Sequence, residues 1–237
     1  KVLKSEPDNL KIFSDKAMIL KELKMDAEVL KIYEKMIEKD PNNVYILFDR
    51  GIILSNMGKE AEALTAFSKV LELQPEHSGA MARKGLNLGM QRQYAQSLAL
   101  LDKALEKDPS DWFSLYAKGM VWKLKGTDLK SLDRRYEAVK SLDNALQAFE
   151  KATSINPDNS KLWFEKGLIF KDLDRGNEAI RAFNKSIDLD PMNPKVWYEK
   201  GVTLKVLGSE GEASKCFEKV LEIEPTHTLA RHKLKKM

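Results

Sequence analysis

The amino-acid sequence predicts an all-α protein, a solenoid of antiparallel helix pairs. Prolines recur every 34 residues along the chain, apart from one interval of 48. The segment from Ser160 to Asn193 shows one unit most clearly, with apolar residues at helical spacing on both sides of a short turn at Asp174–Gly176. Because such a unit buries its apolar stripe mainly against its neighbours, the 237 residues are expected to form one elongated array.

The prolines set the register of six units. Each unit takes its closing proline as position 32, so the interval of 48 gives the fourth unit 14 extra residues. The predicted units span 10–43, 44–77, 78–111, 112–159, 160–193 and 194–227, within a single array covering 1–237. Residues 1–9 resemble the end of a second helix, which indicates that the chain begins inside a preceding unit. Residues 228–237 are expected to form a terminal helix.

Two packing signals recur in this register. Position 8 of the first helix is glycine in five units, and a glycine inside a helix costs roughly 1 kcal/mol relative to alanine. The row therefore predicts a close approach of the two helices of each unit, and the second helix carries a small–large–small stripe on one face. The residues concerned are Gly51, Gly85, Gly119, Gly167 and Gly201, with Ala63/Phe67/Val70, Ser97/Leu101/Ala104, Ala145/Phe149/Ala152, Ala179/Phe183/Ser186 and Ala213/Phe217/Val220.

This pattern resembles the tetratricopeptide (TPR) repeat, W-x2-L-G-x2-Y…A-x3-F…P with a period of 34 residues. The best unit matches it at Trp163, Gly167, Phe170, Ala179, Phe183 and Pro191. The resemblance covers nearly the whole chain and implies a right-handed superhelix whose first helices line a concave groove. One departure is systematic, because Lys or Arg replaces the leucine at position 7. This style resembles archaeal and bacterial TPR proteins and implies a prokaryotic source.

The position-7 cations have two interpretations. A row of six could hold an acidic partner or a phosphate backbone. Lysines and acids also recur on the second helix. We therefore favour the interpretation that the aliphatic parts of the position-7 side chains pack over apolar surface and their charged groups pair with acids. The residues are Lys16, Arg50, Lys84, Lys118, Lys166 and Lys200.

The fourth unit departs from the period through an insertion at Gly126–Arg135. Its first helix looks ordinary, and no proline or glycine interrupts Leu129 to Ile155, so we expect one long second helix from about Asp133 to Ile155. The insertion is either a tolerated loop or a protrusion that contacts a partner or a second copy through residues 126–145.

Composition excludes several classes of function. The net charge is +4 with 32% charged residues of mixed sign, which is typical of a solvated repeat surface and not of a nucleic-acid footprint. The single cysteine, Cys216, excludes an internal disulfide framework and favours a reducing, cytoplasmic location. No apolar run approaches the length of a membrane span, so no membrane partner is expected.

No cluster of residues has the pattern of an active site. His227 and His232 are five residues apart, which is not the i,i+4 spacing of two metal ligands on one helical face. His77 and His227 fall between units and are expected to lie at the surface without a role. The glycines follow the repeat and form no phosphate-binding loop. The sequence therefore predicts no catalytic residue, no metal, no cofactor and no enzyme activity.

The first helices carry a second apolar stripe besides the one needed for stacking. Positions 2, 5 and 9 share one helical face, and the resemblance places that face on the concave groove. We expect position 9 to serve partly in packing between neighbouring first helices, whereas stacking gives no reason for aromatic residues at position 5. The predicted partner-binding residues are Tyr45, Phe48, Ile52, Phe113, Tyr116, Met120, Phe164, Leu168, Tyr198 and Val202.

One TPR subtype, the carboxylate clamp, holds the C-terminal carboxylate of a chaperone tail with five polar residues of three successive units. The first three units of this chain match that set only at Arg83. The sequence therefore predicts no clamp of this kind.

The sequence thus predicts a non-catalytic scaffold that binds a peptide or helix of a partner protein in its groove. The alternative is a structural or self-assembly module that uses the long fourth unit. A third possibility, a fragment of a larger enzyme, has no support in these residues.

Overall fold

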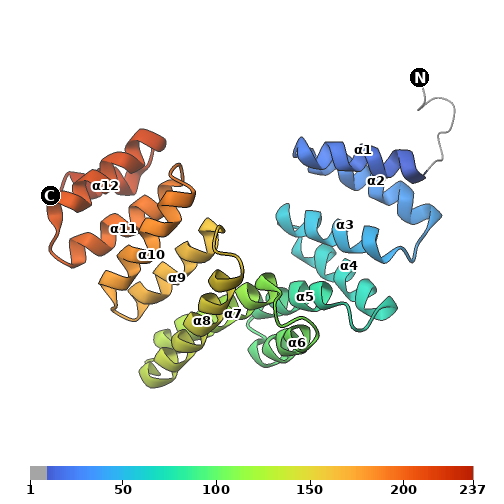
Figure 1. Ribbon diagram of the computed structural model, residues 1–237, viewed down its shortest axis with the longest axis horizontal. Coiled ribbons are helices and arrows are strands. Elements are labelled where there is room, and N and C mark those ends of the chain that lie inside the picture. The colour runs from blue at the N-terminus through green and yellow to red at the C-terminus, as the bar shows by residue number, and fades with distance from the viewer. Residues whose placement is uncertain (1–9, 237) are drawn as a thin grey trace.

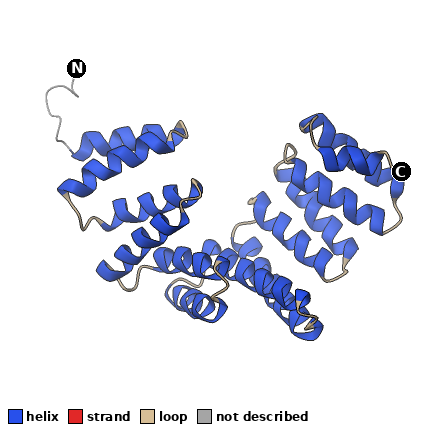
Figure 2. Cartoon of the chain, turned by 180° about the vertical axis from the view of Figure 1, so that it is seen from behind, coloured by secondary structure: helices blue, strands red, loops and turns tan. Residues whose placement is uncertain are grey.

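The computed structural model describes residues 10–236, which form helices and no strands (Figure 2). In this described part of the chain, twelve helices alternate as first and second helices of successive pairs, and a short helix follows them. Their bounds are α1 Leu10–Glu22, α2 Asp26–Lys39, α3 Val44–Asn56, α4 Glu60–Leu73, α5 Ser78–Met90, α6 Tyr94–Lys107, α7 Trp112–Ser131, α8 Arg135–Ile155, α9 Ser160–Asp172, α10 Gly176–Leu189, α11 Pro194–Val206, α12 Glu210–Ile223 and α13 Thr228–Leu234.

The helix pairs stack in chain order into an open arc (Figure 1). The α7–α8 pair lies at the bend of the arc, and α1–α2 and α11–α12 lie at its two ends. This arrangement confirms the predicted all-α solenoid. The right-handed twist and the division into six repeats stay predictions. The expected second-helix segment at residues 1–9 lies outside the described residues.

A close contact between glycine and a large side chain holds each of five pairs together. A Cβ built on Gly51 would lie 2.5 Å from Phe67, and the corresponding distance is 2.9 Å from Gly119 to Phe149. The stripe residues that flank these large side chains are buried throughout. The predicted close approach of the helices is therefore confirmed, and its cause is a ring or leucine that occupies the space of the missing Cβ.

Position 34 closes each unit by capping the first helix of the next one. Asn43 accepts a hydrogen bond from the Ile46 amide, and the Asp111 carboxylate accepts two from α7. The expectation that His77 and His227 have no role is wrong, because Nδ1 of each accepts a backbone N–H at the start of α5 or α13, 3.2 Å away. An acceptor at this position satisfies a donor that the first helical turn leaves unpaired.

The insertion lengthens both helices of the fourth pair. The other first helices have 13 residues and α7 has 20, and the other second helices in the pairs have 14 and α8 has 21. The predicted long second helix, from about Asp133 to Ile155, is confirmed by α8. The expectation of an ordinary first helix was wrong, since α7 continues through Gly126 and the turn lies at 132–134. Asp133 takes the left-handed conformation, with φ 57°, that closes the other helix pairs as well.

The added turns pack in the same way as the rest of the pair. A Cβ on Gly126 would lie 3.1 Å from Leu142, which repeats the contact of Gly119 with Phe149 seven residues later in α7 and seven residues earlier in α8. The extension of α7 is also tied to the preceding pair, because the Tyr94 hydroxyl donates to the Asp128 carboxylate at 2.6 Å. The extension is therefore a hairpin whose packing is continuous with the rest of the fold.

Candidate partner-binding surface

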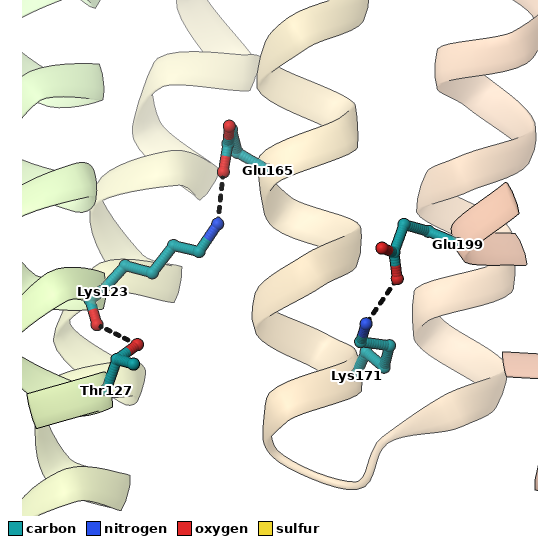
Figure 3. Close-up of polar contacts among 5 residues, drawn as sticks. All are labelled: Lys123, Thr127, Glu165, Lys171 and Glu199. Atoms are coloured by element: carbon teal, nitrogen blue, oxygen red, sulfur yellow. Dashed lines mark hydrogen bonds and ion pairs between the residues drawn. The ribbon is translucent and has the colours of Figure 1, made fainter. Parts of the chain in front are cut away.

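The first helices of the pairs present one continuous face, which we call the A surface. It comprises positions 2, 5, 6, 9 and 12 of α1, α3, α5, α7, α9 and α11. A lysine at position 12 reaches an acid at position 6 of the next first helix in three places: Lys21 to Asp49 at 2.7 Å, Lys123 to Glu165 at 2.7 Å, and Lys171 to Glu199. Figure 3 shows the last two pairs, which join α7 to α9 and α9 to α11.

These ion pairs differ in exposure. The side chains of Lys123 and Glu165 are only 20% and 10% exposed, whereas those of Lys21 and Asp49 are 44% and 38% exposed. Asp172 lies near the shielded pairs; burial raises the pKa of its carboxyl, and the ammonium groups of Lys123 and Lys171 oppose that rise. These three ion pairs, which we call the ladder, cross-link neighbouring first helices and pair three of the lysines on the A surface.

A hollow of about 430 Å³ opens on the A surface between α1 and α3. Tyr45 and Met18 line it with side chains that are mostly exposed, and Met36 and Ile46 supply further apolar lining. The Tyr33 hydroxyl donates to Asp49 at 3.1 Å at one side of it. Burial, followed by the Asp49 charge, raises the pKa of Tyr33, so this hydroxyl stays protonated. Apolar walls with a small polar corner are typical of sites that bind an organic side chain.

The predicted binding residues are spread along the A surface and are unequally accessible. Tyr45 is 82% exposed, while Tyr116 is only 6% exposed and contributes little accessible surface. The remaining eight are half-buried: Phe48, Ile52, Phe113, Met120, Phe164, Leu168, Tyr198 and Val202. Only Tyr45 among the ten lines the hollow between α1 and α3.

The aromatic residues at position 5 have a packing role that the sequence analysis did not anticipate. Phe48 lies against Phe67 with ring centroids 5.9 Å apart, and Tyr198 lies against Phe217 at 5.8 Å. Tyr116 and Phe164 make the same contact with the phenylalanines of α8 and α10. Each ring thus extends the glycine–phenylalanine contact inside its own pair, so aromatic character at position 5 does not by itself indicate a binding site.

Two features of this surface were missed from the sequence. The Lys–acid ladder could have been found, because lysine at position 12 and an acid at position 6 of the next unit both recur in register. The stacking of His77 on Phe48, with centroids 4.7 Å apart, had no such signal, because no pattern links position 34 to position 5. The position-7 cations were interpreted correctly at Lys118 and Lys166, which pair with Asp102 and Glu150 of the preceding second helix.

Within residues 10–236, no group of three or more histidine, cysteine or acidic side chains is placed to hold a metal ion. None of the helices described is both long enough and apolar enough to cross a membrane.

Sequence profiles described as tetratricopeptide repeat match residues 32–65, 136–159, 160–193 and 194–227, which together cover more than half of the chain. The chain belongs to the tetratricopeptide repeat family. TPR proteins are in general non-enzymatic scaffolds for protein–protein interaction, and this TPR array has the corresponding fold. No curated protein matches the chain in sequence.

Several solved structures are similar to this chain. It aligns with the APC/C hetero-tetramer Cut9–Hcn1 at a TM-score of 0.83 and 14% identity, over 99% of this chain and 44% of that one. The human IFIT1 dimer with m7Gppp-AAAA aligns at a TM-score of 0.80 and 19% identity, over 99% of this chain and 56% of that one. YrrB, described as a TPR protein with an unusual peptide-binding site, aligns at a TM-score of 0.54 and 23% identity, over 86% of this chain and 98% of that one. At these identities the likeness shows the fold alone.

Proposed function

We propose that this TPR array is a non-catalytic scaffold that binds an extended or helical segment of a partner protein along its A surface. The observation that carries the proposal is the hollow between α1 and α3, where Tyr45 and Met18 remain exposed beside a polar corner. An aromatic side chain left in solvent next to a concave apolar site is the kind of residue that dominates binding energy in protein interfaces. The half-buried residues at positions 5 and 9 continue this surface toward α11.

The absence of nucleic-acid and membrane partners, the cytoplasmic location and the prokaryotic source stay predictions. Three of the A-surface lysines are paired within the fold, which leaves fewer free cations for a polyanion.

The test selects binders from a random dodecapeptide library displayed on phage. Wild type should enrich peptides, and a Met18→Ala/Tyr45→Ala variant should bind the selected peptides about tenfold less well, because a central apolar contact is worth more than 1.4 kcal/mol. Tyr136→Ala is the matched control, since Tyr136 is 81% exposed but lies on α8. Equal affinity of all three proteins would remove the hollow from the site, and a library that yields no binder would refute peptide binding.

A second candidate function, self-association through residues 126–145, is favoured by the end of the α7–α8 hairpin. Leu132 is 67% exposed and Tyr136 is 81% exposed, and Val139 lies exposed one turn beyond Tyr136 on α8. If this end joins two copies, Leu132→Asp/Tyr136→Asp should convert an oligomer to a monomer in light scattering without loss of helix by circular dichroism. A wild-type protein that is already monomeric would exclude it.

A further inference from the structure

The A surface reverses its charge at one position. Position 6 holds Asp49, Glu165 or Glu199 where the ladder is formed, but α5 carries Arg83 there. Position 12 of the preceding first helix is Ser55, whose hydroxyl donates to Glu60. Among the described residues, no acid forms an ion pair with Arg83 and no side chain accepts a hydrogen bond from it. A ladder position is thus occupied by a cation without a carboxylate partner.

Arg83 is held in place by an aromatic ring. Its guanidinium carbon lies 3.8 Å from the ring centroid of Phe113, at position 2 of α7. Asp111 acts on the guanidinium electrostatically, but its carboxylate is engaged by the amides of Phe113 and Ser114 and by the Ser114 hydroxyl. A guanidinium stacked on a ring keeps its N–H donors free for a ligand while its plane is fixed.

A second cation lies on the same group of rings. Lys161, at position 2 of α9, places its Nζ 4.8 Å from the ring centroid of Tyr116, and that ring lies 5.9 Å from Phe113. None of the ion pairs formed by described residues includes Lys161, and Glu165 on the next turn is taken by Lys123. These contacts separate the two cations by no more than the span of about four residues of extended chain, at roughly 3.4 Å per residue.

We propose that Arg83 and Lys161, with the rings of Phe113 and Tyr116 between them, form a subsite for an acidic segment of a protein partner. Two carboxylate side chains up to about four residues apart would bind the cations, and an apolar residue between them would lie beside the Phe113 ring, one face of which Arg83 covers. This proposal rests on the peptide-binding function above and specifies the charge of the ligand. Ring contacts distinguish these two cations from the ladder lysines Lys21, Lys123 and Lys171, which are paired with acids.

The same phage library tests the subsite, because a displayed peptide has no free C-terminal carboxylate. Peptides selected by wild type should be enriched in Asp and Glu, and Arg83→Gln/Lys161→Gln should lose that enrichment while it still selects apolar residues. It should also bind the acidic peptides about tenfold less well, which is the loss expected from one charge-assisted hydrogen bond.

Lys103→Gln/Lys185→Gln is the matched control. It removes two positive charges from the same two pairs, but on exposed positions of α6 and α10, and should keep the acidic preference. Thermal melts of both variants establish that they are folded.

The possible outcomes separate the two proposals. Selected peptides without acidic enrichment, or enrichment that survives in Arg83→Gln/Lys161→Gln, would overturn the subsite alone. No selected peptide would overturn both. Binding of polyuridylate RNA is measured in parallel. If the protein binds this RNA through Arg83 and Lys161 and selects no acidic peptides, the two cations bind phosphates and the subsite proposal is wrong.

Discussion

The ring of Phe67 occupies the space that a side chain at Gly51 would need, with Cε1 only 2.5 Å from the position of the missing Cβ. Phe67 is 2% exposed and is enclosed by α3, α4 and their neighbours, so it has nowhere to move. We therefore predict that Gly51→Ala destabilises the protein by about 1–3 kcal/mol, although alanine is the better helix former.

Urea denaturation of Gly51→Ala beside Gly211→Ala measures this effect. Gly211 lies in the first turn of α12 with no atom within 4 Å of its missing Cβ, so its replacement should be neutral or stabilising. Equal free energies of unfolding for the two variants would show that the glycine row is not required by packing.

The turn of the last helix pair gives a separate prediction about backbone conformation. Gly208 has φ 81° and, like Gly211, no atom within 4 Å of its missing Cβ. Gly208→Ala should therefore cost about 1 kcal/mol through the left-handed backbone alone, and Gly211→Ala should not. Thermal unfolding of the two variants makes the comparison, and a stabilised Gly208→Ala protein would contradict it.

Burial should decide which ion pairs matter for stability. Lys123→Met leaves the shielded Glu165 carboxylate without its partner, so we expect a loss of about 1–3 kcal/mol in the free energy of unfolding. Lys107→Met breaks a pair with Glu76 whose side chains are 45% and 74% exposed, and should cost less than about 1 kcal/mol. Urea titrations of both variants provide the measurement. A larger loss for Lys107→Met would show that shielding is not the deciding factor.

The tie between α6 and the extension of α7 predicts a dependence on alkaline pH. Burial and the hydrogen bond to Asp128 raise the pKa of Tyr94 to about 12, above its ordinary value of about 10 in the unfolded chain. Its contribution to stability is therefore complete below about pH 10 and is lost as pH rises through about 12. Tyr94→Phe should be less stable than wild type at pH 8. Between pH 10 and 12, the stability of Tyr94→Phe should fall less than that of wild type. Urea midpoints of both proteins at pH 8, 10 and 11.5 provide the measurement. If the two proteins lose stability equally over this range, the prediction is wrong.

The repeat register predicted most of the fold, because a 34-residue period fixes where each apolar stripe meets its neighbour. The fourth pair was harder to predict. Its local pattern permits a helix throughout Leu129 to Ile155, and only the contacts of Gly126 with Leu142 and of Tyr94 with Asp128 show where the turn falls. These contacts join different helices, so the periodicity of the sequence within one helix does not reveal them.

The binding surface was less predictable than the fold. A pattern of helix faces shows which residues point to the same side, but not how much of each side chain its neighbours cover. Tyr45 and Tyr116 were predicted from the same face, yet one stands in solvent and the other is enclosed by Phe113, Phe149 and Lys161. Accessibility depends on the second helix and on the next pair, which a single-helix pattern does not contain.

The equal lengthening of α7 and α8 has a consequence for how such an array can change in evolution. Seven residues make almost two complete α-helical turns, so each added segment returns the helix to nearly the same rotational phase. A pair can therefore grow outward by about 10 Å per step, at 1.5 Å per residue, while the glycine of one helix still meets the large side chain of the other. The length of one helix pair can therefore change without altering how the neighbouring repeats pack.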